Sequence, residues 1–189
     1  MRDEKGTGKN RRAHLRDFVL GANGRYVYRG DTYRFAGSAS ERCRAYAAVG
    51  AFALLSLAAS VAAGCIPAAG MENCFYVILP WLVWVICDLL LALSACRLLL
   101  SSDPLRAYVY RKSAELLPSR AAASAIAPAA CLLGETVYLI LNGADGKIPL
   151  VLLFIALLLL SSASAYLLRR RATTLRYERI APSHHTDGD

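Results

Sequence analysis

The fold is decided by the stretch from Phe75 to Leu100, FYVILPWLVWVICDLLLALSACRLLL. Its 26 residues contain two charged side chains, Asp88 near the middle and Arg97 near the end. About 20 apolar residues in a helix cross the hydrocarbon core of a bilayer, and a soluble core helix rarely needs so long a run. The stretch is therefore predicted to span a membrane. A carboxylate at the centre of such a span is costly and calls for a reason.

Three further apolar runs complete the predicted membrane domain of residues 44–168. The four expected spans are residues 45–66, 75–100, 119–141 and 148–168. The predicted fold class is an all-α integral membrane protein, an antiparallel bundle of four transmembrane helices with a small cytoplasmic N-terminal β-hairpin or meander.

The basic residues predict how the spans are oriented. Lys and Arg number 11 in residues 1–44, 5 in residues 97–120 and 5 in residues 169–189, and the opposite loops hold only Lys147. Because cytoplasmic loops carry an excess of Lys and Arg, both termini and the middle loop are predicted to be cytoplasmic. We expect a multi-pass protein of the plasma membrane.

The net charge of +8 is explained by this topology. Basic residues beside spans attract anionic lipids of the inner leaflet, each by about 1 kcal/mol. The interleaved Tyr and Arg residues of 25–35 suit nucleic-acid stacking or lipid headgroups, and their position beside a span favours headgroups. The lipid bilayer is the expected partner, and no nucleic acid is required.

The segments outside the bundle are predicted from composition and turn signals. Residues 1–16 are charged and are expected to be disordered. Residues 17–43 contain the hairpin turn signal Asn23-Gly24 and short aromatic, β-branched runs, which indicate a β-hairpin or meander. Ser102-Asp103-Pro104 predicts a helix start in the middle loop, for a helix lying in the membrane interface or in solvent. Residues 169–189 are expected to be a flexible cytoplasmic tail.

Asp88 and Glu135 are the candidate intramembrane polar site. Asp88 lies 13 residues into its span, about 20 Å from the outer end, and Glu135 is about 9 Å deep. This difference in depth excludes a direct hydrogen-bonded pair but allows one polar seam joined by water or hydroxyls. Asp88 is either an interhelical contact, to Ser56, Ser60 or Ser94, or a titrating or cation-binding group on a transport path, and the same alternatives apply to Glu135.

The cysteines and histidines indicate no catalytic or metal site. Cys65 and Cys74 flank the first outer loop and are either joined by a disulfide in an oxidising compartment or kept apart as thiols. The three histidines lie in the terminal segments, and no catalytic triad, metal-ligand cluster or cofactor fingerprint is present. No catalytic, cofactor-binding or metal-binding residue is assigned, and no cofactor is expected.

Two functions remain open at this point. The first is a structural, accessory or interaction protein of the membrane without catalytic chemistry, which packs against a second copy of itself or another membrane protein. Small residues at intervals of four, Ser56, Ser60 and Gly64, provide a face that another helix can approach closely. The alternative is a small oligomeric proton- or cation-coupled transporter that uses Asp88 and Glu135.

Overall fold

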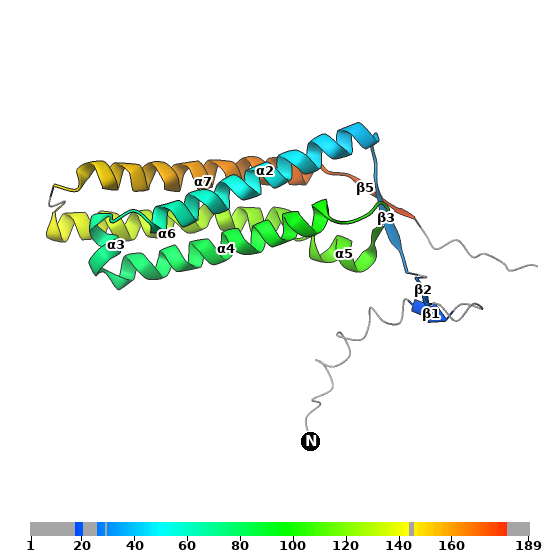
Figure 1. The fold of residues 1–189 in the computed structure, drawn as a ribbon, viewed down its shortest axis with the longest axis horizontal. Coiled ribbons are helices and arrows are strands. Elements are labelled where there is room, and N and C mark those ends of the chain that lie inside the picture. The colour runs from blue at the N-terminus through cyan, green and yellow to red at the C-terminus, as the bar shows by residue number, and fades with distance from the viewer. Residues whose placement is uncertain (1–17, 21–25, 29, 144–145, 181–189) are drawn as a thin grey trace, which may run out of the picture.

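Four long helices run side by side along the molecule (Figure 1). The computed structural model describes residues 18–20, 26–28, 30–143 and 146–180. The long helices are α2 (Ala39–Gly64), α4 (Phe75–Leu99), α6 (Leu117–Asn142) and α7 (Ile148–Thr174). Within these described residues, four helices are long and apolar enough to cross a membrane, which confirms the expected number of apolar helices.

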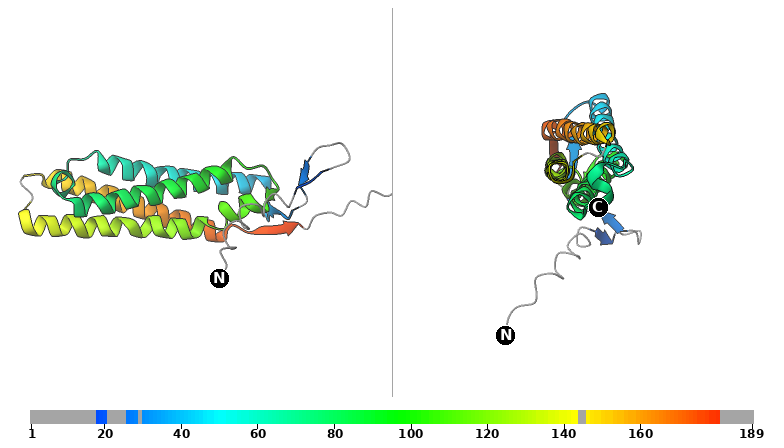
Figure 2. Two further views of the ribbon diagram at one scale, coloured as in Figure 1. Left: turned by 90° about the horizontal axis from the view of Figure 1, so that it is seen from below. Right: turned by 90° about the vertical axis from the view of Figure 1, so that its left-hand side faces the viewer.

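The helices form a closed bundle in which each contacts two neighbours. Helix α2 packs against α4 and α7, and α6 packs against the same two helices from the other side. The view along the bundle shows this arrangement around a common centre (Figure 2). The buried hydrophobic side chains of the described residues form three clusters, and each of the two larger clusters contains residues from all four long helices.

Helix α2 begins earlier than its apolar run, and α7 ends later. The Ser38 hydroxyl accepts the Glu41 N–H at 3.2 Å, and the Glu41 carboxylate accepts the Ser38 N–H at 2.9 Å. This reciprocal capping box starts α2 at Ala39. At the other end, the arginines of residues 169–171 continue α7 to Thr174, since arginine is a good helix former.

The outside of the bundle is apolar. Large aliphatic side chains on all four helices are more than half exposed, among them Leu54 at 67%, Leu79 at 55%, Ile140 at 77% and Leu159 at 61%. Soluble monomers rarely expose contiguous apolar patches larger than a few hundred square ångströms. This exterior therefore matches a hydrocarbon environment better than water.

A three-stranded sheet closes one end of the bundle. Strand β3 (Thr32–Phe35) lies between β4 (Leu105–Arg106) and β5 (Tyr177–Ile180) and is antiparallel to both. The sheet therefore joins the segment before α2, the loop after α4 and the segment after α7. We call this end of the molecule the sheet end.

The predicted N-terminal meander is only partly correct. Strands β1 (Phe18–Leu20) and β2 (Tyr26–Tyr28) form an antiparallel pair on either side of the expected turn. The turn residues, Asn23-Gly24, lie outside the described residues, as does the segment 1–16. Strand β3 does not extend this pair, because β4 and β5 provide hydrogen-bond partners on both of its edges.

Aromatic side chains fasten the sheet to the bundle. The rings of Tyr33 and Tyr110 are stacked, with centroids 4.0 Å apart and planes inclined by 7°. Phe35 contacts Tyr46 of α2 and Tyr177 of β5 edge to face. The hydroxyls of Tyr46 and Tyr177 lie 3.1 Å apart and form a hydrogen bond. The sheet is thus packed against α2.

The middle loop and the last described residues differ from their predicted structures. No helix begins at residues 102–104, because Leu105 is buried and Leu105–Arg106 pair with β3 as β4. The short helix α5 (Ala107–Lys112) follows and carries Tyr110 to the sheet. Within the expected tail, α7 continues to Thr174 and Tyr177–Ile180 form β5.

Candidate functional site

A buried carboxylate lies at the centre of the bundle. Asp88 of α4 is fully buried. The Ser56 hydroxyl of α2 donates to its Oδ1 at 3.0 Å, the Ser124 hydroxyl of α6 donates to the same oxygen, and the Ser161 hydroxyl of α7 donates to Oδ2 at 3.3 Å. Each of the other three long helices therefore gives one hydroxyl to this carboxylate. We call these four residues the Asp88 cluster.

The serines of the cluster also lie within hydrogen-bond distance of one another. The hydroxyls of Ser56 and Ser161 lie 2.9 Å apart, and those of Ser56 and Ser124 lie 3.4 Å apart. The indole N–H of Trp84, one helical turn before Asp88, donates to the Ser161 hydroxyl at 3.0 Å. Because Trp84 is itself fully buried, it both fills the interior and adds a donor to the polar network.

Of the three serines proposed for Asp88 from the sequence, Ser56 and Ser60 lie within reach of its carboxylate. Ser56 donates to the carboxylate as expected, whereas the Ser60 hydroxyl donates to the Leu57 carbonyl at 2.9 Å. The Ser94 hydroxyl donates to the Leu90 carbonyl of its own helix, also at 2.9 Å. A serine in a helix readily bonds a carbonyl one turn back, which competes with a contact between helices.

Sequence reasoning missed the other two partners. Ser124 and Ser161 lie in the third and fourth apolar runs, and their hydroxyls form interhelical hydrogen bonds to Asp88. The sequence did contain a signal for these partners, because each of the other three apolar runs includes at least one serine. That signal identifies candidates, but the rotation of each helix decides which serine reaches the centre.

Glu135 occupies a separate site, near the end of the bundle opposite the sheet end. Its side chain is 1% exposed, and its Oε1 accepts the Gly70 N–H at 3.3 Å. Gly70 belongs to α3 (Ala69–Asn73), a short helix in the connection between α2 and α4 that packs against α6. Oε2 has no hydrogen-bond partner in the described part of the chain. This oxygen is the one unsatisfied polar atom among the buried side chains described.

A glycine permits the approach of α3 to Glu135. A Cβ placed on Gly70 would lie 2.4 Å from Oε2 and 2.9 Å from Cγ2 of Val77.

Asp88 and Glu135 have different hydrogen-bond partners, so the bundle holds two separate buried carboxylates. Asp88 is bound by hydroxyls on three helices, and Glu135 by one backbone N–H.

The cysteines near this end are free thiols. Cys65 is exposed and Cys74 is half-buried, and no bond joins them. Among the described residues, no group of three or more His, Cys, Asp or Glu side chains is placed to hold a metal ion.

The fold and the site together define a class of architecture, a four-helix bundle with an apolar exterior and a buried carboxylate–serine cluster. No protein-family model, curated protein or solved structure matches the chain. The geometry of the described residues therefore carries the functional conclusion.

Proposed function

We propose that the protein is a multi-pass plasma-membrane protein of structural or interaction type, without catalytic chemistry of its own. The observation that carries this proposal is the Asp88 cluster, in which one hydroxyl from each other long helix binds the same carboxylate. In a low-dielectric interior, a polar group left without partners is costly. The cluster therefore favours one pairing and one register of the four helices.

The cluster resembles a packing device more than a transport site. Asp88, Ser56, Ser124 and Ser161 are all fully buried, and Trp84 next to them is also fully buried. A residue on a transport path must exchange partners with water or an ion as the substrate passes. Here both carboxylate oxygens already accept hydroxyl donors, so groups of the protein itself satisfy their hydrogen bonding.

The charge distribution supports cytoplasmic termini. In the part of the chain that the structure describes, Lys147 is the only basic residue at the end opposite the sheet, and it forms an ion pair with Glu72. The remaining basic residues described lie toward the sheet end. By the positive-inside tendency, the sheet end faces the cytoplasm and its anionic inner leaflet.

A partner would bind a surface other than the small-residue face of α2. Ser56 and Ser60 are fully buried inside the bundle, and a Cβ on Gly64 would meet the Trp81 ring at 2.2 Å. These small residues therefore pack against helices of the same chain. A second copy or another membrane protein would contact the exposed aliphatic exterior or the sheet end.

The test compares stability with ion flux in the Asp88→Asn variant reconstituted in liposomes. Asparagine keeps an acceptor for the serines but cannot carry the negative charge. The structural proposal expects Asp88→Asn to lower the unfolding temperature and wild-type liposomes to show no proton- or cation-dependent uptake above empty ones. A variant that folds like wild type but loses a wild-type uptake activity would contradict the proposal.

The alternative is a small oligomeric proton- or cation-coupled transporter, and Glu135 is the observation in its favour. Its Oε2 is buried without a hydrogen-bond partner in the described chain. Such an oxygen is available to a proton or to a donor group from a ligand. In the same liposomes, Glu135→Gln abolishes uptake if this function is correct.

A further inference from the structure

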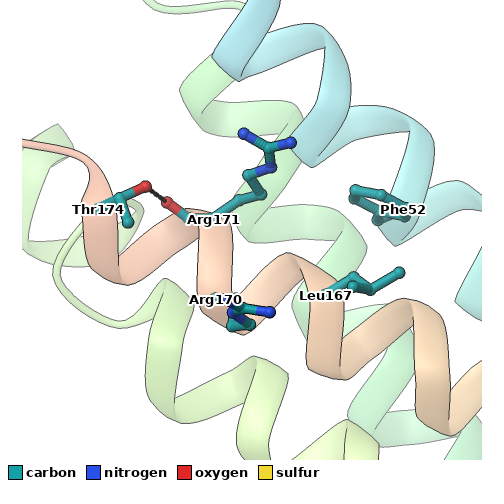
Figure 3. A pocket seen from close by; sticks show the side chains of 5 residues that line it. All are labelled: Phe52, Leu167, Arg170, Arg171 and Thr174. Atoms are coloured by element: carbon teal, nitrogen blue, oxygen red, sulfur yellow. Dashed lines mark hydrogen bonds between the residues drawn. The ribbon is translucent and has the colours of Figure 1, made fainter.

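A groove lies between α2 and α7 toward the sheet end of the bundle. It has a volume of about 370 Å³ and is lined by Phe52 of α2 and by Leu167, Arg170, Arg171 and Thr174 of α7. Figure 3 shows the Arg171 side chain extending from α7 toward α2, with Leu167 and Phe52 farther along the groove. Small-molecule sites commonly range from about 300 to 1,000 Å³, so the groove is large enough for part of a ligand.

The groove has an apolar part and a cationic part arranged along the helix axis. Leu167, Arg170, Arg171 and Thr174 are spaced so that they share one face of α7. Leu167 lies four residues before Arg171, about 6 Å nearer the middle of the bundle. Phe52 is half-buried and packs against the core at this level. The apolar side chains therefore lie deeper than the arginines.

The two arginines are available to an external anion. Both are exposed, and neither forms an ion pair with any residue that the structure describes. Two carboxylates of the sheet end, Asp31 and Asp103, pair with other arginines. The Thr174 hydroxyl donates to the backbone carbonyl of Arg171 at 2.8 Å, so it does not compete for an anion bound to the guanidinium groups.

We propose that this groove binds one anionic phospholipid, with the phosphate on Arg170 and Arg171 and an acyl chain along Leu167 and Phe52. The proposal rests on the proposed placement of the helices in a bilayer with the sheet end at the inner leaflet. Guanidinium groups match the oxygens of a phosphate and bind it with charge-assisted hydrogen bonds. A phospholipid has its acyl chains deep in the bilayer and its phosphate near the surface, which matches the apolar side chains and the arginines of the groove.

The experiment measures lipid binding to the full chain in detergent micelles by native mass spectrometry. Phosphatidylglycerol and phosphatidylcholine with identical acyl chains are titrated separately. We expect phosphatidylglycerol to bind in preference, and the double variant R170A/R171A to weaken its binding about tenfold or more, since two charge-assisted contacts are lost. The matched control R169A/R176A removes the same charge outside the groove and is expected to change the affinity less than about twofold.

Three outcomes would overturn the lipid site. Equal losses in R169A/R176A and R170A/R171A would show a general attraction of charge. Equal binding of phosphatidylcholine would show that the anion is not recognised. Competition by inorganic phosphate at the concentration of the lipid would identify a free phosphate as the ligand. Circular dichroism confirms the helical content of each variant, and R170K/R171K, which keeps the charge but not the planar fork, should bind with intermediate affinity.

Alkaline carbonate extraction of membranes separates this proposal from the proposed function. A chain that remains in the membrane but shows no lipid preference contradicts the groove alone. A chain that carbonate releases contradicts the membrane-spanning placement on which the groove depends.

Discussion

The Ser56 hydroxyl donates to Oδ1 of Asp88 at 3.0 Å and links α2 to α4 in the centre of the bundle. The two residues are 32 positions apart in the chain, and both are fully buried. Because Ser124 and Ser161 bind the same carboxylate, this contact belongs to a network that reaches all four long helices. Loss of the acceptor should therefore affect more than one helix pair.

Asp88→Ala should destabilise the bundle more than Asp88→Asn. Alanine leaves the three serine hydroxyls without their acceptor, and each unsatisfied buried group costs about 1–3 kcal/mol. Asparagine keeps a carbonyl oxygen at the same place and should cost about 1 kcal/mol or less. Chemical unfolding in detergent micelles, followed by circular dichroism, measures both values. Equal stability of the two variants would show that the hydroxyls find other acceptors.

Gly134→Ala should weaken the contact between α4 and α6. A Cβ at Gly134 would lie 2.8 Å from the Tyr76 carbonyl oxygen, a backbone atom that moves only with its helix. We expect a loss of about 1–3 kcal/mol, as for other overpacked interiors. Gly50→Ala is the matched control, because its Cβ would meet the flexible Leu99 side chain, also at 2.8 Å. The control should stay within about 1 kcal/mol of wild type, with helix propensity in its favour. If Gly50→Ala were as destabilised as Gly134→Ala, the distinction between a clash with backbone and a clash with a flexible side chain would be wrong.

The stability of the sheet end should fall at alkaline pH through Tyr177. Burial, together with the hydrogen bond to Tyr46, raises the pKa of Tyr177 above its ordinary value of about 10. The folded state then holds this proton at pH values where the unfolded chain has lost it. Stability from this group is fully present below about pH 10 and declines as the pH rises above that value. Tyr177→Phe should have a lower unfolding temperature than wild type at neutral pH but a shallower decline between about pH 9 and about 11. If the unfolding temperatures of wild type and Tyr177→Phe declined in parallel, Tyr177 would not be the source of the pH dependence.

Two native cysteines, Cys43 on α2 and Cys65 directly after its last residue, test the orientation of the helix. Cys43 and Cys65 are both exposed, and their separation of 22 positions corresponds to about 33 Å of helix, close to the thickness of the hydrocarbon core. In variants that keep one of these cysteines and have alanine at the other five, an impermeant maleimide should label Cys65 on intact cells. Cys43 should react only after permeabilisation. Labelling of both from one side would contradict a membrane-spanning α2.

The sequence predicted the four apolar helices because hydropathy and helix length are local properties. The ends of these helices were less accurate. Ser38 and Glu41 form a capping box before the apolar run of α2, and Arg169–Arg171 remain helical after that of α7. The positions of charged residues therefore indicated where the apolar runs end and not where the helices end.

The three-stranded sheet and most of the Asp88 cluster could not be predicted in the same way. Strands β3, β4 and β5 have two to four residues each and come from distant parts of the chain, so their pairing depends on the bundle that brings them together. Ser124 and Ser161 reach Asp88 because of how α6 and α7 are rotated, and that rotation depends on the packing of all four helices. Ser56 was identified because it belongs to a repeating face of small residues.

The order of the strands along the chain also fixes an order of events during synthesis. Strand β3 emerges from the ribosome before any long helix, but its partner β5 is the last element described, at Tyr177–Ile180. The pairing of Thr32 with Ile180 can form only when translation has passed the end of α7. The sheet is therefore completed after all four helices have been made, and a chain that stops before β5 lacks this closing contact. A chain without the last strand would thus contain all four helices but would expose an unpaired edge of β3, which quality-control proteases can recognise.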